Sequence, residues 1–138
     1  MEKNLTVARD PQWPTPLVYA YLGDAVYELM VRRRLVQQRP RKINSLHRET
    51  VRLVCAKQQR IFMDRLLPLL SEAEREAARK GRNLKPRHVP ASASGEEYAA
   101  STAFEALIGY LFWEGREQRL QELIDLLLAD YFLEAGEE

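Results

Sequence analysis

The sequence of 138 residues predicts a single all-α domain, and three observations support that prediction. Apolar residues recur at helical spacing, helix-capping sequences precede three of the apolar stretches, and no apolar–polar alternation with hairpin turns occurs. A chain of this length is too short for two independent cores. We expect one domain over residues 1–138, with a loose arm at residues 1–14 and an acidic tail at residues 134–138.

The first helix is expected to begin directly after the arm. Thr15 can cap it with its hydroxyl, and Pro16 suits the first helical position, where no backbone N–H is needed. The helix then covers residues 17–37 and ends before Pro40. Its apolar stripe consists of Val18, Leu22, Ala25, Val26 and Leu29.

A second helical stretch is expected over residues 44–68, with a bend along its length. Cys55 lies on its apolar stripe, so we expect this thiol in the core. Ser71 and Glu74 form a capping box, in which each side chain accepts a hydrogen bond from the other residue's backbone N–H. They predict a short helix that ends at Gly81.

Residues 83–93 contain two prolines and no apolar period, and they are expected to form a loop with a basic start. Ser94 and Glu97 form another capping box, and the helix that follows is expected to end near Trp113. The last predicted helix covers residues 116–133, which brings the total to five or six helices. Its inner side consists of Leu120, Leu123, Ile124, Leu127, Leu128 and Tyr131.

Charge is distributed unevenly along the chain, although the formal net charge is only +1. Residues 30–60 hold ten basic residues and one acid, residues 75–88 hold six and one, and residues 91–138 hold two and eleven. Sixteen of the 21 basic residues are arginine, whose guanidinium matches a phosphate bidentately. The segregation favours a polyanionic partner for one surface. The alternative is two solvated helix faces of opposite sign.

The composition also argues against several classes of protein. No apolar run approaches the roughly 20 residues of a membrane span, and the N-terminus lacks the apolar segment of a secretory signal. One cysteine rules out an internal disulfide and a multi-cysteine zinc site. No serine–histidine–aspartate arrangement, phosphate-binding loop or dinucleotide fingerprint occurs. We expect a cytoplasmic protein without a membrane partner, and we expect its aromatic residues, Tyr21 and Phe112 among them, mostly in the core.

Asp24 is the first candidate for chemistry. It follows Gly23 in the middle of the first helix, and both residue types are poor choices inside a helix. Gly23 would allow another helix to approach closely, and Asp24 is then expected to face that contact. Glu28 lies one turn later, where an ion pair with Arg32 is the favoured interpretation.

Glu105 is the second candidate, because it is the only charged residue between Glu97 and Glu114. A carboxylate in such an apolar stretch is costly unless it is paired or binds a metal. Gly109, four residues later, again indicates a close helix approach. Thr102 lies on the same face as Glu105, and its hydroxyl could orient a water or hydrogen-bond back to a carbonyl.

Two interpretations of these carboxylates remain open on the residues alone. Two central helices each carry a glycine and an inward carboxylate, and carboxylates with room for water suit Mg²⁺. Alternatively, Asp24 and Glu105 each pair with a buried arginine. Neither histidine stands at metal-ligand spacing.

Two octapeptides carry a resemblance to a known family. Residues 21–28, YLGDAVYE, resemble the signature helix of the ribonuclease III catalytic domain, and residues 104–111, FEALIGYL, resemble its second catalytic segment. They stand in the right order and at a plausible separation. Between them, Leu46-His47, Arg52, Ala56, Lys57 and Lys80-Gly81-Arg82-Asn83 are similar to the Mini-ribonuclease III branch. The resemblance runs from about Leu17 to Leu128 and leaves nothing over for a double-stranded RNA-binding domain.

The resemblance implies an all-helical homodimer with the ribonuclease III endonuclease fold. It implies an endoribonuclease that cleaves double-stranded RNA with Mg²⁺, for which Mn²⁺ can substitute, leaving 5′-phosphate and 3′-hydroxyl ends. Asp24 and Glu105 match catalytic, metal-binding carboxylates, with Thr102 as a further contributor through water. Ala20 and Thr102 stand where full-length enzymes carry acids. We therefore expect fewer carboxylates and more water around the metal.

The resemblance also indicates how RNA would be held, since double-stranded RNA presents mainly phosphates and 2′-hydroxyls. The candidate RNA-binding residues are Lys80, Arg82, Asn83, Lys85 and Arg87, with Arg52 and Lys57. Binding is expected to be weak and strongly salt-dependent. The expected substrate is a precursor of large-subunit (23S) ribosomal RNA, and a ribosomal protein is a possible partner. The alternatives are a catalytically silent protein that binds structured RNA in ribosome assembly, and a helical interaction protein with buried ion pairs.

Overall fold

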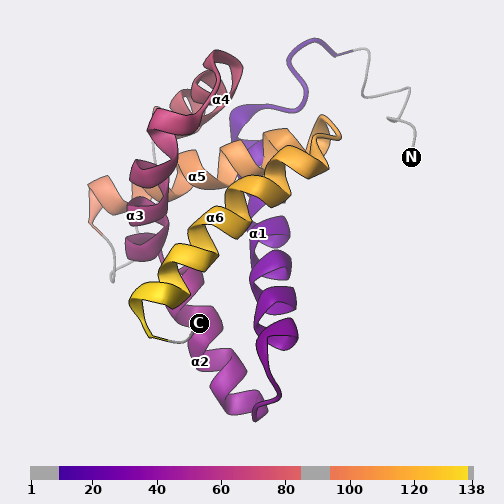
Figure 1. Cartoon of the computed structure of the whole chain (residues 1–138). Helices are drawn as coiled ribbons and strands as arrows, with labels where there is room; N and C mark the ends of the chain where they lie inside the picture. Colours follow the sequence, from indigo (N-terminus) through magenta and orange to yellow (C-terminus); the bar gives the residue numbers. More distant parts are fainter. Residues whose placement is uncertain (1–9, 85–93, 137–138) are drawn as a thin grey trace.

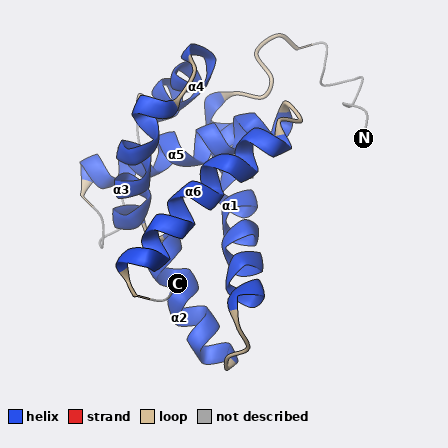
Figure 2. Ribbon diagram, viewed as in Figure 1, coloured by secondary structure: helices blue, strands red, loops and turns tan. Residues whose placement is uncertain are grey.

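A computed structural model describes residues 10–84 and 94–136 of the chain. Within these residues the fold is entirely helical and contains no strand, as Figure 2 shows. The predicted all-α class is therefore confirmed. The elements are α1 (Pro16–Gln38), α2 (Ile43–Val54), α3 (Ala56–Leu66), a short 3₁₀ helix (Leu67–Leu69), α4 (Glu72–Arg82), α5 (Gly95–Trp113) and α6 (Glu117–Glu134).

Three of the helices begin at the predicted capping residues. Thr15 Oγ1 accepts a hydrogen bond from the Val18 N–H at 3.3 Å, and proline occupies the first position of α1. Ser71 with Glu74 opens α4, and Ser94 with Glu97 opens α5, both as complete capping boxes. These caps satisfy N–H groups that have no partner within the helix.

The predicted bend in the second helical stretch is a complete break. Cys55 adopts an extended conformation, with φ −68° and ψ 155°, and separates α2 from α3. The prediction that Cys55 lies in the core is wrong, because the break turns its side chain to the surface. The short 3₁₀ helix replaces the last turn of the expected stretch.

Helix α5 is the centre of the bundle. It packs most extensively on α1, and it also contacts α4, α3 and α6. In Figure 1, α6 crosses diagonally in front while α1 and α2 extend below. Almost every residue from Ala100 to Leu111 is buried, as is typical of a helix that is apolar all round. The predicted inner leucines of α6 are buried as expected.

The apolar stripe predicted on α1 faces the core only in part, since Val26 packs against the core while Ala25 and Leu29 are exposed. The buried residues of α1 are Ala20, Gly23, Tyr27, Met30, Val31 and Leu35. Leu29 is 67% exposed and Tyr21 is 82% exposed, so α1 presents a second apolar face to its surroundings. Phe112 on α5 is exposed as well, so two of the aromatic residues expected in the core lie at the surface.

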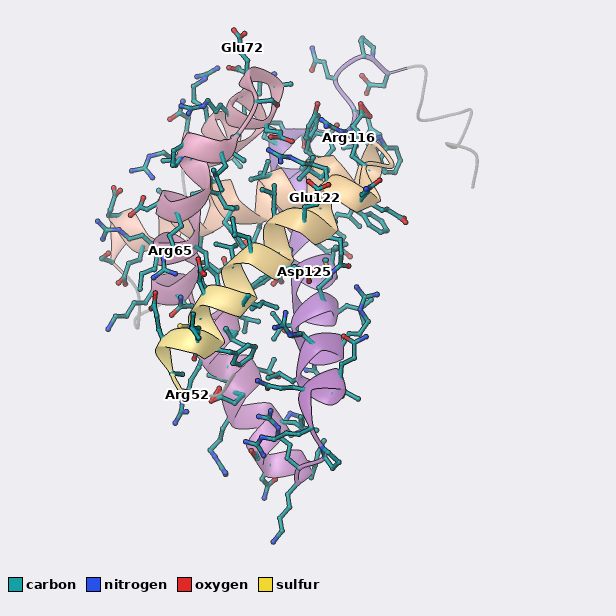
Figure 3. All side chains as sticks on the ribbon, viewed as in Figure 1. Arg52, Arg65, Glu72, Arg116, Glu122 and Asp125 are labelled. Atoms are coloured by element: carbon teal, nitrogen blue, oxygen red, sulfur yellow. The ribbon has the colours of Figure 1, made fainter. Side chains whose placement is uncertain are left out.

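An ion pair joins two helices that are distant in the sequence. Arg65 on α3, labelled in Figure 3, pairs with Glu134 at 2.7 Å and joins α3 to the end of α6. None of the helices in the described part of the chain is long and apolar enough to cross a bilayer.

Candidate functional site

The site is built on a very close crossing of α1 and α5. A Cβ atom added to Gly23 would lie 1.8 Å from the backbone oxygen of Glu105, and one added to Gly109 would lie 1.9 Å from that of Tyr19. No other residue type fits at either position, so the predicted close approach is confirmed. The crossing therefore places Asp24, the residue after Gly23, next to Glu105, the residue of α5 that Gly23 contacts.

This crossing brings the two candidate carboxyl groups together. Asp24 on α1 and Glu105 on α5 share a hydrogen bond. Burial and the nearby Asp24 charge raise the pKa of Glu105 to about 8. Asp24 is exposed, so the expectation that both carboxylates point inward holds only for Glu105, which is partly buried. Asp24 lies at the rim of the crossing because Gly23, one position earlier on α1, is the residue that packs against α5.

A second buried carboxylate shows what an ion pair does in this fold. Arg119 donates to both oxygens of Glu74 at 2.9 Å, and these hydrogen bonds hold the pKa of Glu74 below its usual value. Within residues 10–84 and 94–136, neither Asp24 nor Glu105 forms an ion pair with a basic side chain. The described structure therefore gives no support to the alternative of buried arginine partners. The raised pKa of Glu105 is that of a carboxyl group without a cation.

Two neighbours of the carboxylates have other partners. The Thr102 hydroxyl donates to the Tyr98 carbonyl oxygen at 2.9 Å, which is one of the two roles expected for it from the sequence. The lone pairs of the hydroxyl oxygen remain as acceptors. Glu28 accepts from Arg32 at 2.6 and 3.0 Å, so the predicted pair one turn after Asp24 is confirmed.

Gln59 also belongs to this site, although the sequence pattern did not predict it. Gln59 on α3 is only 1% exposed, and its side chain hydrogen-bonds Glu105. Its spacing with Phe62, Met63 and Leu66 on the buried face of α3 is the signal that could have found it. A glutamine at a core position needs polar partners, and these identify the site.

The donor set of the crossing fits a hard divalent cation. Two carboxyl groups meet there, on two helices that the glycine crossing holds in close contact. Oxygen donors of this kind are those that Mg²⁺ prefers, usually with several waters. Across the described ranges, no group of three or more His, Cys, Asp and Glu side chains could hold a metal. The protein's own donors at the site are therefore few.

Comparison with known proteins assigns this arrangement to a family. The family model described as Ribonuclease III domain matches residues 17–116, which include both helices of the crossing. The chain belongs to the ribonuclease III family. Among its relatives are proteins named Mini-ribonuclease 3. The one from Symbiobacterium thermophilum is 46% identical over 122 residues, covering 88% of this chain and 92% of that protein. The one from Brevibacillus brevis is 41% identical, covering 89% and 92%.

A solved structure agrees with the family assignment. A protein from Fusobacterium nucleatum superposes with a TM-score of 0.79 at 27% identity, covering 90% of this chain and 97% of that one. The predicted ribonuclease III fold and the Mini-ribonuclease III resemblance are thereby confirmed. The chain is an endoribonuclease of the class that cleaves double-stranded RNA and leaves 5′-phosphate and 3′-hydroxyl ends. Enzymes of the ribonuclease III family use divalent metal ions.

The candidate RNA-binding residues of this ribonuclease III domain are distributed over several elements. Arg52 on α2 pairs with Glu49 at 2.9 Å, and Lys57 is exposed at the start of α3. Lys80, Arg82 and Asn83 are exposed at the end of α4. Arg82 forms an ion pair with Glu96 of α5. Lys85 and Arg87 lie outside the described residues.

Proposed function

We propose that Asp24 and Glu105 hold Mg²⁺, or Mn²⁺ in its place, and that this site hydrolyses double-stranded RNA. The observation that carries the proposal is the meeting of two carboxyl groups at the Gly23–Gly109 crossing, without a basic partner among the described residues. A bound divalent cation compensates their mutual repulsion and favours the ionised form of Glu105. The few protein donors leave positions for water and for phosphate oxygens.

When bound, the cation supplies Lewis-acid activation of a water and of the scissile phosphate. The chain's own residues contribute position and charge. Glu105 is held on the most buried helix of the bundle, so its location is fixed by the core. Asp24 is exposed at the rim, so a cation held there would be accessible to an RNA phosphate. The Thr102 hydroxyl oxygen, one turn before Glu105, can accept a hydrogen bond from a water in the site.

Exposed basic residues of this bundle are proposed to bind the RNA backbone. Arg52, Lys57, Lys80 and Arg82 are exposed, and they come from three helices of one bundle. We extend the proposal to Asn83, Lys85 and Arg87. Phosphate contacts of this kind position a duplex without reading its sequence. A precursor of 23S ribosomal RNA is the proposed natural substrate, with a ribosomal protein as a possible partner and the cytoplasm as the location.

A homodimer is proposed to place one active site on each strand of the duplex. The exposed apolar face of α1 supports it: Leu17, Tyr21 and Leu29 are each more than 60% exposed. A groove beside this face runs between α1 and α6 and is lined by Leu22, Val26, Leu29, Met30, Phe112 and Leu120. An apolar face of this kind on a small domain is typical of a contact surface.

Introducing a charge into this face is expected to separate the protomers. Leu29→Arg would bury a guanidinium without a partner in the interface, which costs several kcal/mol. Sedimentation should show twice the 16.1 kDa chain mass for the unmodified protein and a single chain mass for the variant. Leu133→Arg is the matched control, since Leu133 is 64% exposed at the far end of α6. An unmodified protein that sediments as a monomer would contradict the proposed homodimer.

The cleavage proposal is tested with end-labelled double-stranded RNA and purified protein in Mg²⁺ or in EDTA. Cutting is expected in Mg²⁺ only, and Asp24→Asn should lower its rate at least ~10²-fold because it removes half of the carboxylate charge. Glu28→Gln is the control, since Glu28 lies one turn away and pairs with Arg32. RNA that is bound but left intact under every metal condition would favour a silent RNA-binding protein instead.

A further inference from the structure

Gln59 combines features that packing alone does not explain. It is 1% exposed in the middle of α3, on the same buried face as Phe62 and Met63. A glutamine in such a place loses its hydration and much side-chain entropy, and it is tolerated only where its amide finds hydrogen-bond partners. The side chain must therefore be accounted for by what it contacts.

The contacts of Gln59 fix the orientation of its amide. Nε2 donates to the Val54 carbonyl oxygen at 3.1 Å, across the break at Cys55, and the side chain also hydrogen-bonds the Glu105 carboxyl group. Both neighbours are acceptors when Glu105 is ionised, so the NH₂ group, with its two hydrogens, must face them. The flipped amide would place Oε1 against the Val54 oxygen. Oε1 accordingly has no partner in the described structure.

We propose that Gln59 is a positioning residue that holds Glu105 in the orientation required for cation binding. One Nε2 hydrogen anchors the amide to the end of α2, and the other holds the Glu105 carboxylate. The carboxylate is thus restricted on the side of α3 and left open toward Asp24. This inference rests on the proposed metal site and adds a residue to it that is not itself a ligand.

The expected effect is on metal affinity. Groups that hydrogen-bond a metal ligand orient it, and their loss weakens metal binding about 10- to 100-fold. Without Gln59, the Glu105 side chain can rotate and spreads over more rotamers. Cation binding must then restrict Glu105 to one rotamer, which lowers the affinity. A higher cation concentration is therefore required.

Gln59→Met tests the proposal, because methionine matches the length of glutamine and lacks the donor. Two constants are measured: the Mg²⁺ concentration for half-maximal RNA cleavage, and the Mn²⁺ dissociation constant of the RNA-free protein by calorimetry. Both constants are expected to rise about 10- to 100-fold. Cleavage at saturating Mg²⁺ is expected to recover substantially. Gln58→Met, one residue earlier on α3, is expected to leave both constants unchanged.

Tyr27→Phe controls for a purely structural role. The Tyr27 hydroxyl donates to the Leu53 carbonyl oxygen at 2.7 Å, one residue before the carbonyl that Gln59 contacts. This variant also leaves a carbonyl at the end of α2 without its side-chain donor. It is expected to lower the melting temperature as Gln59→Met does, with both metal constants unchanged.

Three outcomes would overturn the proposal. The first is a Gln59→Met protein with lowered stability and unaltered metal constants. The second is an equal change of those constants in Tyr27→Phe. The third is failure of both Gln59→Met and the shorter Gln59→Asn to fold while Tyr27→Phe folds. Failure of the unmodified protein to bind Mn²⁺ or to cleave RNA would instead contradict the proposed function.

Discussion

Glu105→Gln is expected to abolish cleavage and to stabilise the metal-free protein at pH 8. The activity falls because a neutral amide replaces one of the two proposed metal-binding carboxylates. The stability rises because burial and Asp24 disfavour the charged form of Glu105 and raise its pKa from 4.5 to about 8. Glutamine keeps the shape of the protonated acid and carries no charge at any pH.

The pH dependence has a defined sign. The folded protein favours protonated Glu105, so this group contributes fully to the free energy of unfolding below about pH 4.5. That contribution is lost as the pH rises through 8. The loss is about 5 kcal/mol, or roughly 10–20 °C in melting temperature for a domain of this size. The unmodified protein in EDTA should therefore lose stability relative to Glu105→Gln between pH 5 and pH 8.

Thermal melts of both proteins in EDTA and in Mg²⁺ check this expectation. Mg²⁺ should raise the melting temperature of the unmodified protein at pH 8 and leave that of Glu105→Gln unchanged. A Glu105→Gln protein that melts several degrees lower than the unmodified protein at pH 8 would contradict it. That result would indicate a structural hydrogen-bond network in place of an ion-binding site.

Gly23→Ala is expected to disrupt the fold far more than a methyl group added at Gly95. Its Cβ would lie 1.8 Å from the Glu105 oxygen, 2.7 Å from the Glu105 carbonyl carbon and 2.8 Å from the Gly109 nitrogen. All three are backbone atoms of the central helix, so no side chain can move aside. Helix α1 must shift away from α5, at a cost of ~3 kcal/mol or more.

The same shift separates Asp24 from Glu105, so cleavage should be lost even where Gly23→Ala remains folded. Urea denaturation followed by circular dichroism measures the stability, and RNA cleavage is assayed below the transition. Gly95→Ala is the control, because an added Cβ there meets nothing within 4 Å. Equal stabilities of the two variants would show that the helices do not approach this closely.

Local signals in the sequence were sufficient for most of the fold. Thr15, Ser71 and Ser94 mark the starts of three helices, because a side-chain oxygen before an apolar period serves little other purpose. The break at Cys55 has no such signal, since neither proline nor glycine is present. The stripe predicted on α1 meets the core only in part, because α1 is apolar on two sides and spacing alone does not tell which side is buried.

The candidate site was predictable to the extent that its chemistry is unusual for a helix. Gly23 with Asp24 and Gly109 with Glu105 are costly in helices, and the structure brings the two pairs together. The exposure of Asp24 depends on the exact crossing, which spacing does not give. Gln59 was missed because a polar residue at a core position is identified only when its partners are known.

The crossing of α1 and α5 has a consequence for how the chain acquires activity. Asp24 and Glu105 are 81 residues apart, and the most extensive contact of the fold joins these two distant helices. Helices form locally and rapidly, whereas closing a long chain segment is slower. Helical ellipticity therefore reports on events anywhere in the chain during refolding. Regained RNA cleavage reports specifically on the docking of the first helix against the fifth.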